Sequence, residues 1–282
     1  MIFIGKCWPL AARKAETMSY KNLLVEKDGP VAVVTLNRPE KLNALSQQFM
    51  EEIIRLCSDF HRDTETRVVI FQGAGKHFSA GVDLIDAVGQ GWQTMSQFEK
   101  LRGLSLGGRM ITSLWEMDQI TIASLHGVAL GGGACMATAL DFRVGGADCR
   151  MGYPEINLAM NLSWKALPII THLAGPARAK RMVILGEHVD AKTLHRWGLL
   201  DELVDEGIRP LDKAREMALE YAAKPPMAAQ MIKKSVNHLV SALDQAVMHM
   251  DSDQFLLAAG TEDHMEGVSA FLEKREPVFK GQ

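Results

Sequence analysis

The stretch that decides the fold is QITIASLHGVALGGGACMA, residues 119–137. Its first seven residues form a strand-like run, and its last residues favour helix. Between them stand the glycines Gly131–Gly133, which let a backbone approach a neighbouring group closely. A helix start also leaves peptide N–H groups without partners, where the helix dipole favours negative charge. The turn therefore predicts either a site for a ligand oxygen that becomes anionic or close packing of a helix on a strand.

A second turn of small residues follows another predicted strand. Residues 67–73 read as a short buried strand that ends in glycine, and Ser79, Ala80 and Gly81 follow it. Two such turns, about 50 residues apart, can direct two peptide N–H groups at one carbonyl oxygen. Two preorganised donors of this kind stabilise a developing oxyanion in a dry site. Neither turn carries the phosphate-binding pattern of a P-loop or of a dinucleotide-binding fold.

Strands alternate with helices in the first part of the chain, which predicts an α/β core with mostly parallel strands. We expect a hairpin of two strands at 21–26 and 31–36, followed by a helix at 46–60 that is capped by Ser46. Three further strands are expected at 67–73, 119–125 and 141–145. From about residue 161 onward helical periodicity dominates, in 176–186, 190–197, 207–223, 226–238, 241–258 and 262–274. We therefore divide the chain into a core at 19–205 and a helical region at 206–282. Residues 1–18 look unlike the rest, and we expect a loosely ordered extension there.

Composition excludes several classes of protein. The chain has 282 residues and a net charge of −3, whereas nucleic-acid binding needs a basic surface. Its apolar runs are shorter than the ~20 residues that cross a bilayer. The four cysteines are scattered without the spacing of a zinc site, so we predict no metal and no disulfide framework. These features favour a cytoplasmic protein without a nucleic-acid or membrane partner.

Five motifs follow one another along the chain: NRPEKLNAL at 37–45, FSAGVDL at 78–84, HGVALGGG at 126–133, YPEI at 153–156 and GVSAFLEKR at 267–275. Each is weak alone, but in this order they resemble the crotonase superfamily, the enoyl-CoA hydratases and isomerases. The resemblance runs from about residue 20 to the C-terminus. It implies an α/β fold, a crotonase-like spiral of ββα turns with a C-terminal helical cap, assembled as a homotrimer or homohexamer. It also implies an acyl-CoA thioester substrate and no cofactor, because coenzyme A is part of the substrate.

By the same resemblance, the backbone N–H groups of Val82 and Gly132 form an oxyanion hole for the thioester carbonyl. An α-proton next to a thioester is weakly acidic, so a carboxylate removes it at a useful rate only if the resulting enolate is stabilised. Glu155 of the Pro-Glu motif is implied to be the base. Burial is expected to raise its pKa and improve it in that role.

Members of the superfamily that hydrate enoyl-CoA have a second glutamate three residues after the central oxyanion glycine. Cys135 stands at that position, and a thiol neither holds a water as a charged acceptor nor stays ionised without a cationic neighbour. One carboxylate can still move a proton between two carbons of one substrate. We therefore predict enoyl-CoA double-bond isomerisation with Glu155 as the proton shuttle. Two alternatives stay open: a hydratase that holds its water with Asn157 or Asn161, and a non-catalytic protein that binds CoA esters.

The resemblance also suggests which residues meet the rest of the substrate. The candidates for binding CoA are Lys41, Leu42, Ala80, Asp83, Leu84 and Lys280. Both lysines would contact phosphates, Lys280 across a subunit boundary.

Four other side chains near the motifs have expected roles. Met160 and Trp164 are expected to narrow or reshape the acyl pocket. His77 and His126, like Asp83, are expected to make structural hydrogen bonds.

Overall fold

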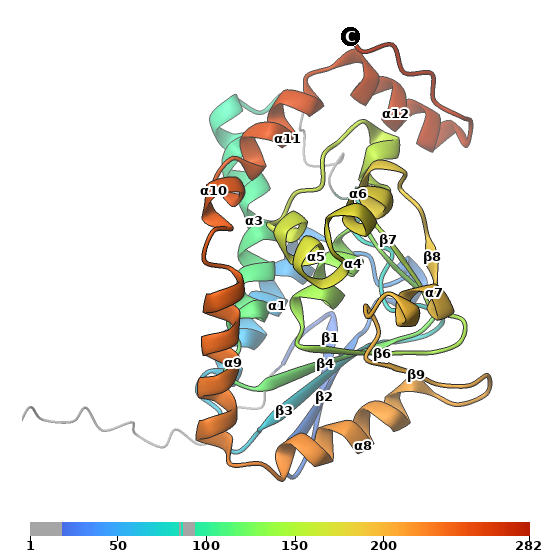
Figure 1. The fold of residues 1–282 in the computed structure, drawn as a ribbon. Helices are drawn as coiled ribbons and strands as arrows, with labels where there is room; N and C mark the ends of the chain where they lie inside the picture. The colour runs from blue at the N-terminus through green and yellow to red at the C-terminus, as the bar shows by residue number, and fades with distance from the viewer. Residues whose placement is uncertain (1–18, 85, 87–93) are drawn as a thin grey trace, which may run out of the picture.

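The structure is a computed structural model that describes residues 19–84, 86 and 94–282 (Figure 1). The extension expected at 1–18 lies outside the described residues. Within them, a six-stranded sheet and a three-stranded sheet carry helices on their faces, and further helices follow at the C-terminal end.

The larger sheet has the strand order β1-β2-β3-β4-β6-β9. β1 and β2 form the expected antiparallel hairpin, and all other neighbours in this sheet are parallel. Parallel neighbours need crossover connections, which the helices between the strands supply. The α/β core is therefore as predicted for the strands at Leu23–Asp28, Val31–Leu36, Val68–Gly73, Ile120–Leu125 and Phe142–Gly145, whereas the edge strand at Glu202–Leu203 was not expected.

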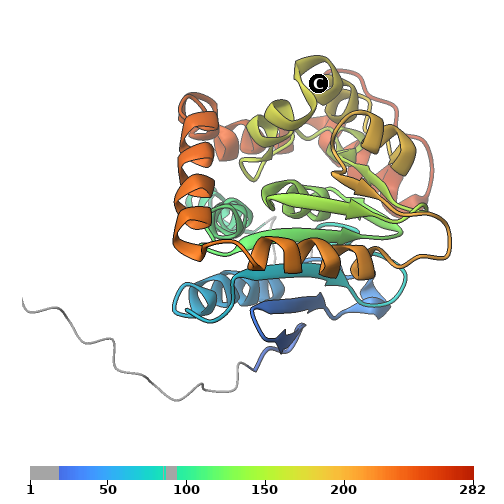
Figure 2. The same ribbon diagram turned by 60° about the horizontal axis from the view of Figure 1, so that its bottom comes forward.

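Alternate side chains of β2 and β3 enter two separate apolar layers, because successive residues of a strand point to opposite faces. Val33 and Ile70 pack in one layer with α8 (Pro210–Ala222), which lies along the sheet in Figure 2. Val34 and Phe71 pack in the other layer. Burial on both faces explains why these strands read as continuous apolar runs. The second layer includes the buried sides of α1 (Gln47–Phe60), α3 (Gln97–Trp115) and α4 (Gly132–Ala139), together with buried residues of later helices.

The smaller sheet was not visible in the sequence, because its strands are only two or three residues long. It contains β5 (Val128–Leu130), β7 (Arg150–Gly152) and β8 (Val189–Asp190). Strands this short give no periodic pattern, and β9 of the larger sheet escapes notice for the same reason. The remaining elements of this part are η1 (Pro39–Lys41), η2 (Pro154–Leu158), α5 (Ala166–Ala174), α6 (Pro176–Ile184) and α7 (Ala191–Arg196).

The C-terminal part is helical, as expected, but the stretch predicted at 241–258 is divided. The helices are α9 (Pro226–Val240), α10 (Gln245–Met248), α11 (Asp251–Ala259) and α12 (Glu262–Glu273). The division coincides with two contacts to the core: Asp244 pairs with His172 Nε2 at 2.8 Å, and Asp251 accepts the Lys165 amide at 2.8 Å. These tertiary contacts override the local helical preference. The proposed boundary near residue 205 stays a prediction, although α8 beyond it packs on the core sheet. None of the helices in the described part of the chain is both long and apolar enough to span a bilayer.

One buried amide side chain fixes the loop between β3 and the second glycine turn. Asn43 is fully buried, and its Nδ2 donates to the carbonyls of Ala74 at 2.9 Å and His77 at 2.8 Å. Its Oδ1 accepts the Arg38 amide at 2.9 Å. Asn43 also has φ of 54°, a left-handed conformation that asparagine tolerates better than most residues. This side chain therefore holds residues 73–83 against the loop that follows β2.

We expect Asn43→Ala to lower the free energy of unfolding by about 2–4 kcal/mol, because two half-buried carbonyls lose their donor and one half-buried amide loses its acceptor. The measurement is urea unfolding followed by circular dichroism. Asn237→Ala is the matched control, since it removes a single half-buried bond to the Trp115 carbonyl from an exposed helix. That control is expected to change stability by less than about 1 kcal/mol. Equal losses in the two variants would contradict the role of Asn43.

Candidate active site

Val82 lies in a short extended segment whose hydrogen bonds leave its own amide free. The Leu45 amide donates to the Gly81 carbonyl at 2.7 Å, and the Asp83 amide donates to the Leu45 carbonyl at 3.1 Å. In this parallel bridge the Val82 N–H points away from Leu45. Within the described residues it has no hydrogen-bond acceptor. The amide is therefore available to a ligand oxygen.

Gly132 is the first residue of α4, and its amide also has no acceptor in the described part of the chain. The preceding Gly131 has φ of 51°; its amide donates to the Gly152 carbonyl at 3.0 Å. The carbonyl of Gly131 accepts the Cys135 amide at 2.9 Å, which starts the helix. The two turns meet here, because a Cβ added to Gly81 would lie 3.1 Å from the Gly132 nitrogen. The structure thus brings two predicted amide donors into adjacent segments.

Glu155 in η2 has its carboxyl beside the same turn. A Cβ added to Gly131 would lie 3.1 Å from Glu155 Oε1, which is tighter than ordinary van der Waals contact, so the carboxyl lies directly against this glycine. Oε2 is buried and has no hydrogen-bond partner among the described residues. Burial raises the Glu155 pKa from its ordinary value to about 7, as expected. A carboxyl with this pKa exchanges protons readily near neutral pH.

Cys135 lies one turn into α4 and is buried. Burial raises the pKa of its thiol well above the usual value, and the nearby carboxylates of Glu155 and Asp251 raise it further. The thiol therefore stays protonated and cannot replace a water-holding carboxylate.

Asp251 is a carboxylate near the site that the sequence did not reveal. It comes from α11, about a hundred residues after Glu155, and only the tertiary fold brings it close. Burial raises its pKa, while the amides of Trp164 and Lys165 bond to the carboxylate and oppose that shift. Its one sequence signal is its place in the interrupted helical stretch at 241–258.

Four of the residues predicted to bind CoA lie on two loops that contact each other. Leu42 follows η1 with φ of 52°, and its carbonyl accepts the Ala80 amide at 3.0 Å. Asp83 pairs with Arg38 at 3.0 Å, so its carboxylate is engaged in a half-buried ion pair. Lys41 is the last residue of η1 and is exposed.

The other two residues predicted to bind CoA, Leu84 and Lys280, differ in their surroundings. Leu84 is half-buried directly after the Asp83 segment. Lys280 follows α12, and its amide donates to Asp263 at 2.6 Å. Within the described residues, its hydrogen bond is thus to the C-terminal helix and not to the loops at 41–45 and 79–84.

The two asparagines considered for holding a water have other neighbours. Asn161 Nδ2 donates to Gln254 of α11 at 3.3 Å, while its Oδ1 is buried without a partner in the described residues. Asn157 lies against Gly186, and its carbonyl is close to Gly267 of α12. Neither contact places an amide beside the Glu155 carboxyl.

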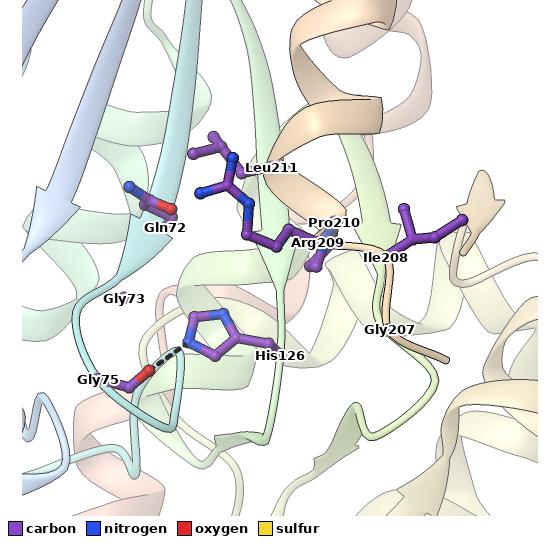
Figure 3. A pocket seen from close by; sticks show the side chains of 9 residues that line it. All are labelled: Gln72, Gly73, Gly75, His126, Gly207, Ile208, Arg209, Pro210 and Leu211. Carbon is purple, nitrogen blue, oxygen red and sulfur yellow. Dashed lines mark hydrogen bonds between the residues drawn. The ribbon is translucent and has the colours of Figure 1, made fainter. Parts of the chain in front are cut away.

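The two motif histidines make the expected structural bonds. His77 Nδ1 accepts the Val128 amide at 3.2 Å, and His126 Nε2 lies 3.2 Å from the Gly75 carbonyl. Both bonds join the two glycine turns. Figure 3 shows that His126 also faces a cavity of about 410 Å³ beside the start of α8, lined by Gln72, Gly73, Gly75, His126, Gly207, Ile208, Arg209, Pro210 and Leu211. Among the described residues, no group of three or more acidic, histidine or cysteine side chains could hold a metal ion.

Comparisons with known proteins agree with this geometry. The family model described as enoyl-CoA hydratase/isomerase matches residues 26–282. A short-chain-enoyl-CoA hydratase from Clostridium acetobutylicum is 30% identical over 260 residues, which cover 92% of this chain and 97% of that protein. A mitochondrial Delta(3,5)-Delta(2,4)-dienoyl-CoA isomerase from Dictyostelium discoideum is 27% identical over 269 residues, which cover 93% and 92% of the two chains.

A solved structure extends the similarity to three dimensions. The crystal structure of an enoyl-CoA hydratase from Bacillus anthracis matches with a TM-score of 0.73 and 29% identity, covering 93% of this chain and 100% of that one. The predicted crotonase-like fold is therefore confirmed. The chain belongs to the enoyl-CoA hydratase/isomerase family and is an enzyme of the crotonase superfamily.

Proposed function

We propose that this enzyme binds the thioester carbonyl of an enoyl-CoA at the amides of Val82 and Gly132 and moves a proton with Glu155. The observation that carries the proposal is the Glu155 carboxyl, which lies buried beside Gly131 with one oxygen unpaired. Two free amides next to a carboxyl of pKa about 7 form an arrangement suited to making an enolate.

The reaction that this arrangement supports best is migration of a double bond. Glu155 would take a proton from C2 of a 3-enoyl-CoA, and the electron pair would move onto the thioester oxygen between the two amides. The same carboxyl would then return the proton to C4, which leaves the double bond between C2 and C3. One proton leaves one carbon and arrives at another, so a single carboxyl is sufficient. The protonated thiol of Cys135 favours this one-acid reaction.

Hydration of a 2-enoyl-CoA is the second candidate, and the relatives support it. The similar protein from Clostridium acetobutylicum is named a hydratase, as is the Bacillus anthracis structure. In this reaction Glu155 would orient a water for attack at C3, while a proton is delivered to C2. The site would then need a second group to hold the water, since Cys135 cannot.

An apolar surface on the C-terminal helices supports a homotrimer or homohexamer. The exposed apolar side chains include Met227, Met231, Ile232, Val236, Leu239 and Leu243 from α9 and the turn after it, and Leu257, Phe271 and Leu272 from α11 and α12. Large exposed apolar side chains gathered on these helices favour an association site. The proposed CoA contact of Lys280 would be made in such an assembly.

Replacing the proposed base tests the assignment. Glu155→Gln keeps the shape of the side chain but removes the proton shuttle, so we expect turnover of enoyl-CoA to fall about 10²–10⁴-fold. Binding of a saturated acyl-CoA, measured by calorimetry, is expected to persist. Glu220→Gln, on the exposed side of α8, is the matched control with unchanged turnover. Unchanged turnover of Glu155→Gln would refute the proposal.

The pH dependence follows from the Glu155 pKa of about 7. The base must be ionised to take a proton, so kcat/KM is expected to rise with pH below about 7 and to become level above it. The measurement is kcat/KM for one substrate from about pH 5 to 9 in buffers of constant ionic strength. A profile that is flat across pH 7 would show that another group takes the proton.

The products distinguish the two reactions. We expect incubation with 3-enoyl-CoA to give 2-enoyl-CoA faster than incubation with 2-enoyl-CoA gives 3-hydroxyacyl-CoA, because one carboxyl suffices for the first reaction only. Chromatography of both time courses measures the two rates. Rapid formation of 3-hydroxyacyl-CoA would favour the hydratase over the isomerase.

A further inference from the structure

Trp164 packs its indole between two helices at the candidate site. A Cβ added to Gly107 of α3 would overlap Cε2, Nε1 and Cδ2 of the ring. A Cβ added to Gly132 of α4 would lie 2.5 Å from Cζ3 and 2.9 Å from Cη2. The ring therefore fits a slot that exists only because both positions are glycine.

This position places the indole beside the reacting groups. Gly132 supplies one proposed oxyanion donor, and the adjacent Gly131 faces the Glu155 carboxyl. Leu45, which bridges to Val82, also lies near Gly132, at 3.2 Å from the same added Cβ. The indole, Leu45 and the Glu155 carboxyl thus surround one turn. An acyl group whose carbonyl oxygen binds the Gly132 amide would therefore lie near the indole.

A carboxylate from the C-terminal helices holds the turn that carries the indole. Trp164 and Lys165 both have φ of 61°, which is unfavourable for residues with a Cβ. Asp251 of α11 offsets this cost, because its carboxylate accepts the Lys165 amide at 2.8 Å and also binds the Trp164 amide. The Lys165 Nζ donates to Thr112 of α3 at 3.1 Å, which ties the turn to a second element.

We infer that Trp164 is the specificity-determining wall of the acyl pocket and that Asp251 is the positioning residue that holds it there. This inference rests on the proposed function and adds the class of substrate. The indole fills space that a longer or branched acyl chain would need, so the enzyme selects enoyl-CoA esters with short, unbranched acyl groups.

The first test measures kcat/KM for short-chain and long-chain enoyl-CoA with Trp164→Ala. We expect the ratio of long-chain to short-chain kcat/KM to rise at least about 10-fold, because the pocket gains room for several methylene groups, each of which changes binding measurably. Trp164→Phe is expected to give an intermediate ratio. A uniform fall for every chain length would show that Trp164 only supports the fold, and would overturn the inference.

A substitution in α3 tests whether the indole depends on the space that Gly107 leaves. Gly107→Ala places a methyl group against the indole, whereas Gly103→Ala on the same helix meets nothing within 4 Å. We expect Gly107→Ala to lower kcat/KM for every chain length about 10-fold or more, because the displaced ring crowds Gly132. The same change in the Trp164→Ala background is expected to have little effect, since the ring is gone. Equal effects in both backgrounds would refute the contact.

Substitutions of Asp251 test whether its carboxylate holds the turn at Trp164 and Lys165. Asp251→Ala removes the acceptor and is expected to shift the chain-length ratio in the same direction as Trp164→Ala. Asp251→Asn keeps an oxygen for the two amides and is expected to restore most of the original ratio. Asp253→Ala, exposed on the same helix, is the matched control with no shift. A ratio unchanged in Asp251→Ala would remove Asp251 from the proposal.

A binding measurement separates this inference from the proposed function. Saturated short-chain acyl-CoA is expected to change the tryptophan fluorescence of the protein, and this change is expected to vanish in Trp164→Phe but to remain in Trp197→Phe. Absence of both acyl-CoA binding and enoyl-CoA turnover in the unmodified protein would refute the proposed function. Turnover and binding in which the fluorescence change survives Trp164→Phe would refute the inference alone.

Discussion

The close approach of two backbone turns is the constraint on which the rest of this structure depends. The segment at Gly81 lies so close to the segment that contains Leu130 and Gly132 that a Cβ added to Gly81 would lie 2.6 Å from the Leu130 carbonyl oxygen. Hydrogen bonds from Ser79 to Val128 and from Leu130 to Ser79 hold the two segments together. Two amides can share one oxygen only if their segments lie this close, and a side chain at Gly81 would press against the Leu130 carbonyl and the Gly132 nitrogen and separate them. The parallel sheet behind the turns supplies the fixed support, since β3 and β4 are neighbours and end at the same edge.

The buried Glu155 carboxyl beside these turns costs folding stability, and its proposed role as a base explains why it is there. A buried carboxyl without a partner destabilises a fold when it ionises, and the raised pKa of Glu155 expresses this penalty. Other buried charges in the molecule are satisfied: Glu52 accepts the amides of Lys21 and Asn22, and Lys233 pairs with Asp141 at 2.7 Å. An unpaired carboxyl next to two unpaired amides is therefore an exception within the described residues, and exceptions of this kind concentrate at reactive sites.

The structure brings the segments of Val82, Gly132 and Glu155 together, while the catalytic roles assigned to these residues stay predictions. Long strands and amphipathic helices have periodic patterns, so β1 to β4 and α1 were expected at nearly their observed positions. The short strands β5 and β7 have no such pattern, although β5 carries the turn into α4. The motifs pointed to Val82, Gly132 and Glu155 through the resemblance to the crotonase superfamily, because each residue lies within a short motif that can be read locally. Asp251 could not be found in that way, since its contact with the turn at 164–165 depends on the path of the C-terminal helices.

Because Asp251 holds the turn at 164–165, the proposed acyl pocket depends on the position of the C-terminal helices that also carry exposed apolar side chains. Neither α10 nor α11 contains a buried residue, and helices of four and nine residues are marginal in isolation. Their position must therefore come from a few specific contacts, such as Asp251 with Lys165 and Asp244 with His172, and from whatever covers their exposed side chains. An assembly that buries this surface would stabilise α11, and with it the turn that carries Trp164. The position of Trp164 in the proposed pocket would then depend on the contacts between subunits, because both involve the same short helix.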